Sequence, residues 1–253
     1  MKILILGDAA AAAVRAAEII AAQVTAKPAS VLGLATGGTM EAVYEKLIAL
    51  HRAGRASFAG AQSFNLDEYV GLSGDHPCSY RRYMAEKLFD QIDIVPDAAH
   101  LPMGEAADAE AEAVRYEAAI VAAGDIDLQL LGLGLNGHIG FNEPTSSLSS
   151  ITRLKTLERS TREANSRYFP DGEEPPRLAI TMGIGTIMRA REVLLVATGA
   201  AKARAVAQVV EGPVSARWPG SVLQMHRHAT LVLDRAAASE LELFDYYLDV
   251  HPE

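Results

Sequence analysis

The sequence predicts a single α/β domain built on a mostly parallel sheet, and three observations support this prediction. Short apolar runs alternate with longer stretches of helical periodicity, which is typical of β-α units. The chain has 253 residues, of which 49% are hydrophobic, enough for one large core. No internal repeat, low-complexity linker or change of composition divides it. We therefore expect one domain over residues 1–253.

The predicted strands are the short apolar runs bounded by turn residues, at residues 3–6, 31–35, 62–65, 126–133, 177–182, 192–198 and 229–234. The predicted helices are the longer stretches between them, at residues 9–24, 40–53, 79–89, 106–123, 184–191, 200–211 and 236–248. Pro28 and Gly54 follow the first two helices and end them. Residues 66–71 are predicted as a loop after the third strand.

Composition argues against several classes of protein. The single Cys78 rules out an internal disulfide framework, and no Cys/His cluster has ordinary zinc spacing, so a reducing cytoplasm fits best. The apolar run at residues 3–6 is too short for a signal peptide, and no window approaches a membrane span of about 20 apolar residues. The net charge of −9 and the pI near 5.3 argue against nucleic-acid binding.

The segment 130–144, LLGLGLNGHIGFNEP, joins an apolar strand to glycines, one histidine and one carboxylate. Three of its glycines match the dinucleotide fingerprint G-x-G-x-x-G, but that motif requires a helix directly afterwards. Here Pro144 ends the segment before a helix can form. We therefore interpret the glycines as letting the backbone pass close to a ligand, with His138 and Glu143 reaching into the space they leave.

Four loops follow predicted strands, at residues 36–39, 65–71, 134–143 and 199–202. They are expected at one edge of the sheet, because ligands of parallel sheets bind outside the carboxyl ends of the strands. The first loop, TGGT, presents backbone N–H groups at the start of a helix, which is one way to bind phosphate. It lacks the Gly-Lys-Ser/Thr of a Walker A loop, which disfavours nucleotide hydrolysis. A tight turn with Thr39 as the N-cap is an equally good interpretation of this motif alone.

Two of these loops carry titratable residues suited to proton transfer. Asp67 and Glu68 lie among apolar neighbours, so one of them is a candidate base, although a solvated turn is the commoner structure for such a pair. His138 with Glu143 is a candidate acid/base pair, because a carboxylate fixes the imidazole tautomer. A surface or structural histidine is the alternative.

Cations gather downstream of this segment and are candidates for binding an anion. Five Lys or Arg residues lie between positions 153 and 167, in a protein that is acidic elsewhere. Arg167 suits phosphate through its bidentate fork and Lys202 as a point charge near a helix start, although most Lys and Arg residues are merely solvated. His226 and His228 flank Arg227 and are interpreted as a polar turn, not as a metal pair.

Five motifs, in their order and spacing, resemble the glucosamine-6-phosphate deaminase family: TGGT, FNLDEYVGL, NGHIGFNEP, TREANSRYF and the segment from Gly199 to Ala203. The resemblance implies a three-layer α/β/α sandwich of modified Rossmann type. It also implies conversion of glucosamine 6-phosphate and water to fructose 6-phosphate and ammonia. Neither a redox cofactor nor a metal is implied, and no nucleic-acid or membrane partner is expected.

The resemblance assigns roles to residues at matching positions. Asp67 matches the base that moves a proton between C2 and C1 of the opened sugar, His138 the group that assists ring opening, and Glu143 its partner carboxylate. The phosphate contacts match Thr36, Gly37, Gly38, Thr39, Arg167 and Lys202. These roles agree with the chemistry, because an aldose–ketose isomerisation needs a base at the carbon acid and a separate acid/base at the ring oxygen, each contributing about 10²–10⁴-fold. The phosphate holds the reacting carbons in register.

Asn136 departs from the family pattern, because many relatives carry Asp at this position beside the catalytic histidine. Asn can form hydrogen bonds but cannot relay a proton, so we expect Glu143 to support His138 alone. Other relatives also have Asn here, so we interpret Asn136 as an active variant and count it among the expected catalytic residues.

Some relatives are hexamers that N-acetylglucosamine 6-phosphate activates at a subunit interface. Ser146, Ser147, Arg153 and Lys155 match that second phosphate site, so this activator and a homo-oligomer are expected, with a monomer as the alternative. Matching residues do not establish coupling between two sites. Residues 153–177 are expected to form a mobile lid.

Three other functions are compatible with the same type of fold. A galactosamine-6-phosphate isomerase would differ only in the preferred sugar epimer, whereas a 6-phosphogluconolactonase needs no base at C2 and would not require Asp67. A sugar-phosphate sensor of a transcription regulator would lack acid/base residues and carry a helix-turn-helix module. Residues 1–30 are taken up by a strand and a helix, which disfavours the sensor.

Overall fold

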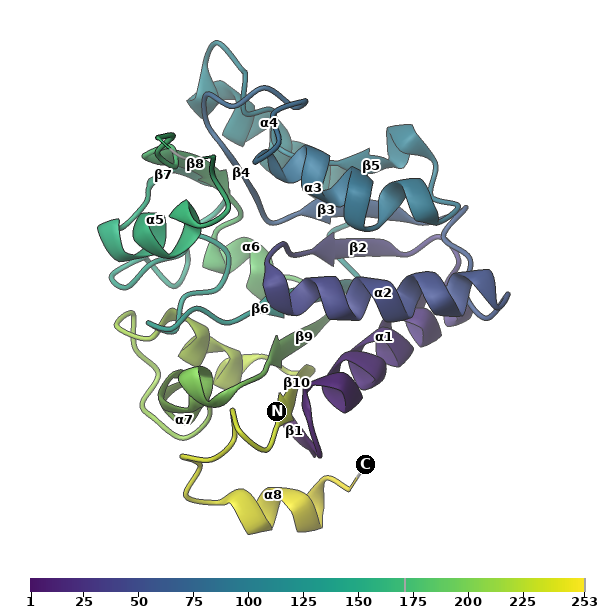
Figure 1. The fold of residues 1–253 in the computed structure, drawn as a ribbon, viewed down its shortest axis with the longest axis vertical. Coiled ribbons are helices and arrows are strands. Elements are labelled where there is room, and N and C mark those ends of the chain that lie inside the picture. The colour runs from purple at the N-terminus through teal and green to yellow at the C-terminus, as the bar shows by residue number, and fades with distance from the viewer. Residues whose placement is uncertain (171, 253) are drawn as a thin grey trace.

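A central sheet of seven strands organises the fold of the computed structural model, which describes residues 1–170 and 172–252 (Figure 1). All neighbouring strands of this sheet are parallel. Their order across the sheet is β1 (Lys2–Leu6), β10 (Ala229–Asp234), β9 (Glu192–Ala197), β6 (Leu128–Gly132), β2 (Val31–Leu34), β3 (Gln62–Asn65) and β5 (Ala99–His100). The predicted α/β class with a mostly parallel sheet is confirmed.

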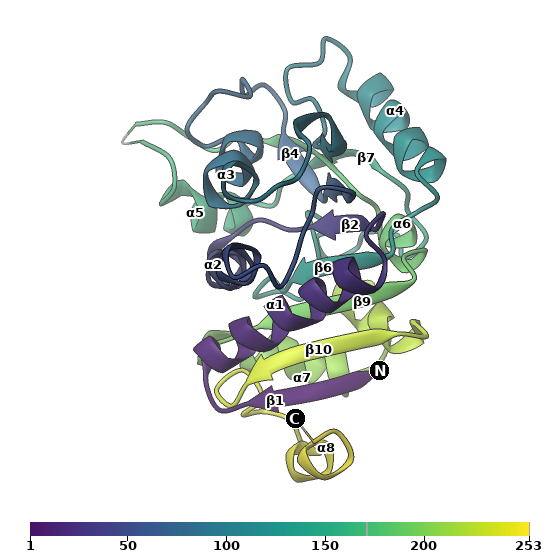
Figure 2. The same cartoon turned by 90° about the vertical axis from the view of Figure 1, so that its right-hand side faces the viewer.

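Helices cover both faces of this sheet. Three of them belong to connections that run across the sheet from β1 toward β5, and three belong to connections that run back. Because parallel crossovers are right-handed, the two groups lie on opposite faces, and Figure 2 shows α2 and α3 on one side of the strands and α4 and α6 on the other. The first group is α1 (Ala9–Ala26), α2 (Gly38–Arg52) and α3 (Tyr80–Lys87), and the second is α4 (Ala109–Ala122), α6 (Ile184–Met188) and α7 (Ala203–Val210). This is the three-layer sandwich that the family resemblance implies.

The strand order predicts a crevice between the carboxyl ends of β2 and β6. These two strands are neighbours, but the chain leaves β2 toward β3 and leaves β6 toward β9, on opposite sides. In open parallel sheets a crevice forms at such a switch point, outside the carboxyl ends of the strands. The loops that follow β2 and β6 carry Thr36 and His138, so the topology brings these two segments together.

A second sheet of three antiparallel strands, which the sequence does not predict, lies beside this edge. It consists of β4 (Asp67–Tyr69), β8 (Leu178–Thr181) and β7 (Arg153–Thr156), in that order. The prediction of a loop over residues 66–71 is wrong, because Asp67 pairs with Thr181, which is 114 residues away. A three-residue strand with such a distant partner has no local periodicity that reveals it.

Three helical segments also differ from the prediction. Residues 236–248 form a helix, α8 (Phe244–Val250), only in their second half, because the Glu211 carboxylate accepts the N–H groups of Glu242 and Leu243 and holds a turn before the helix begins. α5 (Arg159–Ser166) lies in the cationic segment, for which no helix was predicted. The predicted helix at residues 200–211 is divided into a 3-10 turn, Ala200–Lys202, followed by α7.

Among the described residues, α1 is long and apolar enough to span a membrane, judged by length and composition. The expectation that no window approaches a membrane span is therefore wrong by these two criteria. In the fold α1 packs along α2 and β10. Its residues at helical spacing are buried, namely Ala12, Ala13, Ala16, Ala17, Ile20, Ala21 and Val24. This is the pattern of a core helix with one face against a sheet.

Candidate active site

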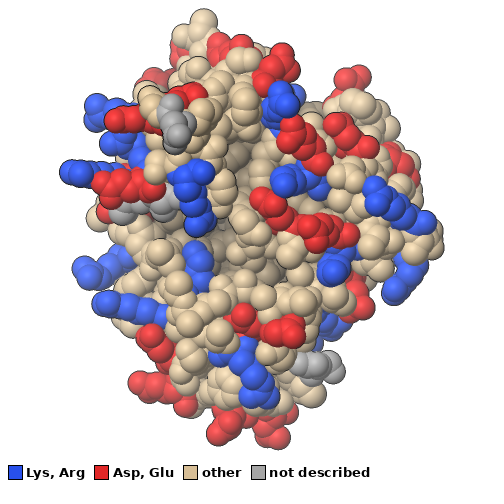
Figure 3. Space-filling view, viewed as in Figure 1, with Lys and Arg blue, Asp and Glu red and all other residues tan. Residues whose placement is uncertain are grey.

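The four predicted loops meet at the carboxyl edge of the central sheet. They follow β2, β3, β6 and β9, whose parallel alignment brings their ends to the same side. Figure 3 shows this face of the molecule, with a hollow near its centre and Lys and Arg side chains along one side of the hollow. The segments that carry Thr36, Asp67, His138 and Lys202 are thus brought together.

Asp67 is buried on β4 and points toward the loop that follows β6. The backbone N–H of Phe141 donates to the Thr181 hydroxyl at 3.1 Å, and that hydroxyl lies 3.5 Å from Asp67 Oδ2. Burial, reinforced by the charge of neighbouring Glu68, raises the pKa of Asp67 from 3.8 to about 8, against the opposing effect of the nearby Phe141 N–H and Thr181 hydroxyl. A carboxyl group with this pKa is both a competent base and a competent acid near neutral pH.

Glu68 is buried beside Asp67 but is fully engaged by backbone groups. Its carboxylate accepts the N–H groups of Tyr69 (2.8 Å), Tyr80 (3.0 Å) and Arg81 (2.9 Å). Burial raises the pKa of Glu68, and these hydrogen bonds oppose the rise. Glu68 therefore ties the first turn of α3 to β4, whereas Asp67 faces the crevice.

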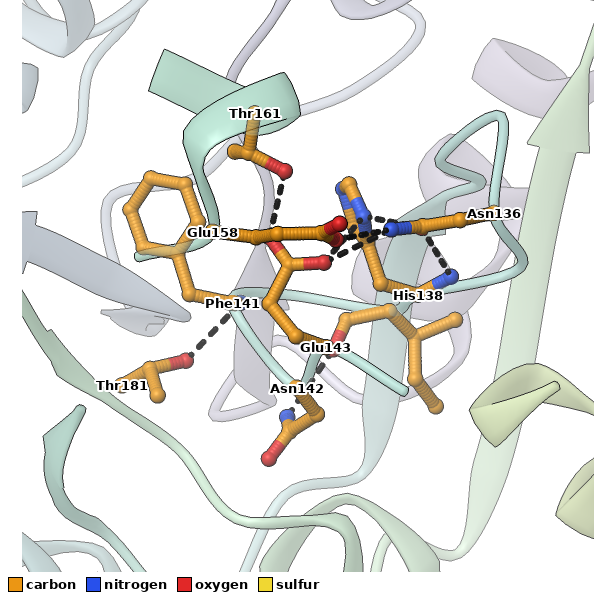
Figure 4. A network of polar contacts seen from close by, with 9 residues as sticks. Asn136, His138, Phe141, Asn142, Glu143, Glu158, Thr161 and Thr181 are labelled. Atoms are coloured by element: carbon orange, nitrogen blue, oxygen red, sulfur yellow. Dashed lines mark hydrogen bonds and ion pairs between the residues drawn. The ribbon is translucent and has the colours of Figure 1, made fainter. Parts of the chain in front are cut away.

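The imidazole of His138 lies against Asn136 and Glu143 (Figure 4). Its Nδ1 atom is 2.7 Å from Asn136 Oδ1 and 3.4 Å from Glu143 Oε2, and Asn136 Nδ2 donates to Glu143 Oε2 at 2.8 Å. The expectation that Glu143 supports His138 alone is therefore wrong, because Asn136 makes the shorter contact. Asn136 and Glu143 together fix the orientation of the His138 imidazole.

Glu143 is held in its ionised form by the groups around it. Burial acts to raise its pKa, but the hydrogen bonds from His138, Thr161 and Asn136 and the charge of His138 outweigh burial and lower the pKa to about 2. The Thr161 hydroxyl, which comes from α5, donates to Oε1. No local pattern of residues indicates this contact of Thr161, because it depends on how the segment after β7 folds back over the loop.

Glycines shape the loop after β6, which carries His138 and passes beside Asp67. A Cβ atom at Gly134 would lie 2.3–2.5 Å from atoms of the His138 ring, so only glycine leaves room for the imidazole. Gly140 has a φ of +53°, and a Cβ atom there would touch Asp67 Oδ2 at 3.4 Å and Thr181 Oγ1 at 3.2 Å. His138 and Phe141 are three residues apart in this loop, so the loop brings the imidazole and the Asp67 carboxylate into one site.

Arg167 and Lys202 place two cations beside the start of α2. The Arg167 Nη2 atom donates to the Tyr168 hydroxyl at 2.8 Å, and that hydroxyl lies 3.6 Å from the Cβ position of Gly38. Burial and the charge of Arg167 both lower the pKa of Lys202. Neither cation forms an ion pair with a carboxylate in residues 1–170 and 172–252.

The first turn of α2 completes this cationic region. Gly37 is the N-cap, with a φ of +111° and no side-chain cap, so the alternative interpretation with Thr39 as the N-cap is wrong. The first N–H groups of a helix have no acceptor within the helix and carry its positive end. The residues expected to contact the phosphate, namely Thr36–Thr39 at the α2 N-terminus, Arg167 and Lys202, therefore adjoin one another.

Tyr80 is a polar contact at this edge whose role was not recognised in the sequence. Its hydroxyl lies 3.3 Å from the Tyr69 hydroxyl and interacts with the Thr36 side chain, and Asn165 of α5 donates to Tyr69 at 2.9 Å. Tyr80 lies in the helix predicted at residues 79–89, but periodicity alone cannot separate a core tyrosine from one that lines a site.

A small second core lies under these residues, apart from the main core. It contains Tyr69, Phe141, Leu157, Phe169 and Ala179, with Tyr80 packed against it. The rings of Tyr69 and Phe169 meet edge to face at 5.7 Å, and Tyr80 stacks on Phe141 at 6.0 Å. This small core joins β4, the loop after β6 and the segment 157–169.

The residues expected at a second phosphate site flank Glu143. Arg153 and Lys155 lie two positions apart on β7, burial lowers the pKa of both, and the charge of Arg153 lowers that of Lys155 further. Glu143 acts on Lys155 in the opposite sense, and its carbonyl accepts the Ser146 N–H at 3.0 Å. The Ser146 hydroxyl is buried without a hydrogen-bond partner in the described part of the chain, and Ser147 follows it.

Other features of the described residues do not compete with this site. No group of three His, Cys, Asp or Glu residues in ranges 1–170 and 172–252 is arranged to hold a metal ion. A surface cavity of about 580 Å³ lies elsewhere, between α2 and α3, and is lined by residues such as Glu41, Glu86 and Lys87. Lys87 and Glu41 pair with each other there at 3.0 Å, so this cavity holds none of the expected catalytic groups.

The sequence and the fold both have close counterparts among known proteins. A family model for glucosamine-6-phosphate isomerases/6-phosphogluconolactonase matches residues 8–232. A glucosamine-6-phosphate deaminase of Shewanella loihica is 54% identical over 253 residues, covering 100% of this chain and 94% of that protein. One of Mycolicibacterium smegmatis is 50% identical over 252 residues, covering 99% and 97%.

Solved structures also place this chain among proteins of this family and fold. A monomeric glucosamine-6-phosphate deaminase has a TM-score of 0.93 and 46% identity, covering 95% of this chain and 100% of that chain. A 6-phosphogluconolactonase from Trypanosoma cruzi has a TM-score of 0.75 at 21% identity, covering 95% and 97%, and shares the fold alone. With a family match over most of its length and relatives above 50% identity, the chain belongs to the glucosamine-6-phosphate isomerase/6-phosphogluconolactonase family.

Proposed function

We propose that this protein is a glucosamine-6-phosphate deaminase of amino-sugar catabolism. It converts glucosamine 6-phosphate and water to fructose 6-phosphate and ammonia. The observation that carries the assignment is the convergence of Asp67, His138 and two cations at one edge of the sheet. A lactonase has no proton to move between carbon atoms, so a buried carboxyl group with a pKa of about 8 supports the deaminase.

His138 is the proposed acid/base for ring opening. With Nδ1 directed at Asn136, the Nε2 atom is free to take the proton of the anomeric hydroxyl and to return a proton to the ring oxygen. The C1–O5 bond breaks, the aldehyde forms at C1, and the imidazole ends the step unchanged. Glu143, ionised and hydrogen-bonded beside the ring, stabilises the transient imidazolium.

Asp67 is the proposed base for the isomerisation that follows. It removes the proton from C2 of the open aldehyde, and the same proton is then delivered to C1. The electron pair of the C2–H bond moves through the enol, the aldehyde oxygen gains a proton and the C2 nitrogen loses one, so that C1 is reduced to an alcohol and C2 is oxidised to an imine. Water adds to the imine, and ammonia leaves from C2 as the ketone forms.

The phosphate is the proposed anchor that sets the distance from these groups to C1 and C2. Arg167→Ala and Lys202→Ala are each expected to raise KM for glucosamine 6-phosphate about 10- to 150-fold, since one charged hydrogen bond contributes about 1.5–3 kcal/mol. The measurement is steady-state ammonia release at varied substrate. Arg204→Ala, an exposed cation of α7, is the matched control and should leave KM unchanged. Wild-type KM in both variants would remove these residues from the phosphate site.

The pH dependence of kcat/KM follows from Asp67. Asp67 is a base only when ionised, and its pKa in the free enzyme is raised to about 8, so kcat/KM is expected to rise about tenfold per pH unit below this value and to level off above it. Glu143 contributes no step in this range, because its pKa is about 2. The profile between about pH 6 and about pH 9 tests this. A flat profile across that range would contradict the role of Asp67.

The experiment that tests the function itself is product analysis with the purified wild-type protein. Glucosamine 6-phosphate should give equal amounts of ammonia and fructose 6-phosphate, and galactosamine 6-phosphate in parallel reactions decides the preferred epimer. Hydrolysis of 6-phosphogluconolactone without ammonia release from either amino sugar would overturn the proposal.

A second sugar-phosphate site at Ser146, Ser147, Arg153 and Lys155 is a separate proposal. Two partly buried cations and a buried hydroxyl without a partner support an anion as the ligand. Titration with N-acetylglucosamine 6-phosphate, together with rate measurements, tests it. Hyperbolic kinetics that this sugar does not change would contradict activation. Light scattering on the same samples separates a hexamer, as in activated relatives, from a monomer, the state named for the 46% identical structure.

The segment 153–177 is the proposed lid over this edge, and residue 171 within it lies outside the described residues. Two contacts support this role, because Thr161 reaches Glu143 and Asn165 reaches Tyr69 from α5. A cytoplasmic location is proposed from the cysteine content alone, since the one cysteine, Cys78, has no disulfide partner within the chain.

A further inference from the structure

A second carboxylate contacts Asn136 in addition to Glu143. The Asn136 Nδ2 atom lies 2.8 Å from Glu143 Oε2 and 3.1 Å from Glu158 Oε2, and Figure 4 shows both carboxylates facing the amide. Ionised carboxylates only accept hydrogen bonds, so the amide nitrogen must face them. Both amide hydrogens of Asn136 are thereby used, one for each carboxylate.

This arrangement determines which ring nitrogen of His138 carries the hydrogen. With its nitrogen directed at two carboxylates, Asn136 must direct Oδ1 at His138, where it lies 2.7 Å from Nδ1 and 3.3 Å from the backbone nitrogen. The amide oxygen only accepts, so Nδ1 bears the hydrogen and the lone pair of the neutral ring is on Nε2. Nε2 is the atom that the proposed ring opening requires.

Glu158 contacts Asn136 and does not cap the helix at which it lies. It occupies the N-cap position of α5, where an acidic side chain commonly accepts an N–H group of the first turn. Here its side chain makes no such cap bond. The carboxylate instead bonds to an amide 22 residues earlier in the chain, at the edge of the active site.

Glu158 is also matched to the residue type at position 136. An Asp in place of Asn136 would bring a third carboxylate within hydrogen-bond distance of Glu143 and Glu158, with no hydrogen to donate to either. Glu158 is therefore compatible with the amide that this chain carries and would be unfavourable beside an Asp at position 136. Asn136 and Glu158 form one unit by this argument.

We propose that Glu158 is a positioning residue for His138, which it serves by fixing the orientation of the Asn136 amide. This inference rests on the proposed function for its kinetic consequence, but the orientation of the amide can be measured without turnover. Glu158 does not touch the reacting atoms. It acts through Asn136, which it reaches from the N-cap position of α5.

The test is a double-mutant cycle with Glu158→Ala, Asn136→Asp and the double variant. Glu158→Ala is expected to lower kcat about 3- to 10-fold with little change in KM, and Asn136→Asp to lower it further. In the double variant the repulsion is relieved, so kcat should recover above that of Asn136→Asp. Glu163→Ala is the matched control, because Glu163 lies on the same helix, is exposed, and pairs only with Arg159 among the described residues.

The second readout is the state of the His138 imidazole in substrate-free protein, followed by nitrogen NMR of the ring. The wild type and Glu163→Ala should show the Nδ1–H tautomer, and Glu158→Ala should also populate Nε2–H. If Glu158→Ala equals Glu163→Ala in both kcat and tautomer, or if the cycle is additive, the inference is overturned. If the wild type releases no ammonia, the proposed function fails, and the tautomer still decides the role of Glu158.

Discussion

Asp67→Asn is expected to lower kcat for ammonia release about 10³-fold while leaving the protein folded. Asn has the shape of Asp and can still accept the Thr181 hydroxyl, but its amide oxygen is too weak a base to take a proton from C2. The measurement is ammonia and fructose 6-phosphate formation, with circular dichroism as the check on folding. Asp90→Asn, at an exposed carboxylate, is the matched control and should keep the wild-type rate.

The stability of the same variant provides an independent check. The pKa of Asp67 is higher in the folded protein than in the unfolded chain, so its contribution to stability is present below pH 4 or so and is lost as the pH rises through about 8. Asn does not titrate. The unfolding free energy of Asp67→Asn should therefore increase relative to that of the wild type as the pH rises through this window. Wild-type turnover by the variant, or a difference in stability that does not change with pH, would contradict the assignment.

Gly134→Ala is expected to lower kcat about 10²-fold, although neither residue carries a reactive group. The new methyl group would occupy the position of the His138 ring, at 2.3–2.5 Å from its atoms, so the imidazole must leave Asn136 and Glu143. Gly134 does not have a positive φ, so the backbone itself accepts alanine. The measurement is kcat, with binding of the substrate checked through KM.

Gly132→Ala is the control for that substitution. It lies two residues earlier, also without a positive φ, and its Cβ would meet Met40 Cε at an ordinary 3.6 Å. This variant should turn over within about threefold of the wild type. If Gly134→Ala matches Gly132→Ala, the position of the imidazole does not limit the reaction, and His138 is not the acid/base group of the rate-determining step.

The parallel sheet was predictable because its strands are short apolar runs separated by helical periods, and each of these signals is local. Residues 62–65 were recognised as a strand from the same pattern, whereas β4, which begins two residues after that strand ends, was not. The hydrogen-bonding partners of β4 lie more than a hundred positions away, and nothing in Asp67–Tyr69 itself indicates an antiparallel edge. The predicted start of α8 was wrong for a similar reason, since a contact with the distant Glu211 carboxylate determines where this helix begins.

The convergence of Asp67, His138 and Lys202 follows from topology, because strands that run in one direction end at one edge. The finer contacts do not follow from it. Glu158 and Thr161 reach the imidazole network only because the chain turns back after β7, and the sequence contains no periodic signal for that turn. The hydrogen bonds of an amide with two carboxylates also depend on distances of a few ångströms, which residue order does not encode.

The small core of Tyr69, Phe141, Leu157, Phe169 and Ala179 has a thermodynamic consequence. A cluster of five buried side chains, distinct from the core of the main sheet, stabilises its surroundings less than that core does and forms a separate cooperative unit. Sub-global opening of this unit therefore requires less free energy than unfolding of β6 and β9. Amide hydrogens of β4, β7 and β8 should exchange with solvent through this opening, well before those of the central strands. The three-stranded sheet can therefore open locally while the seven-stranded sheet stays folded.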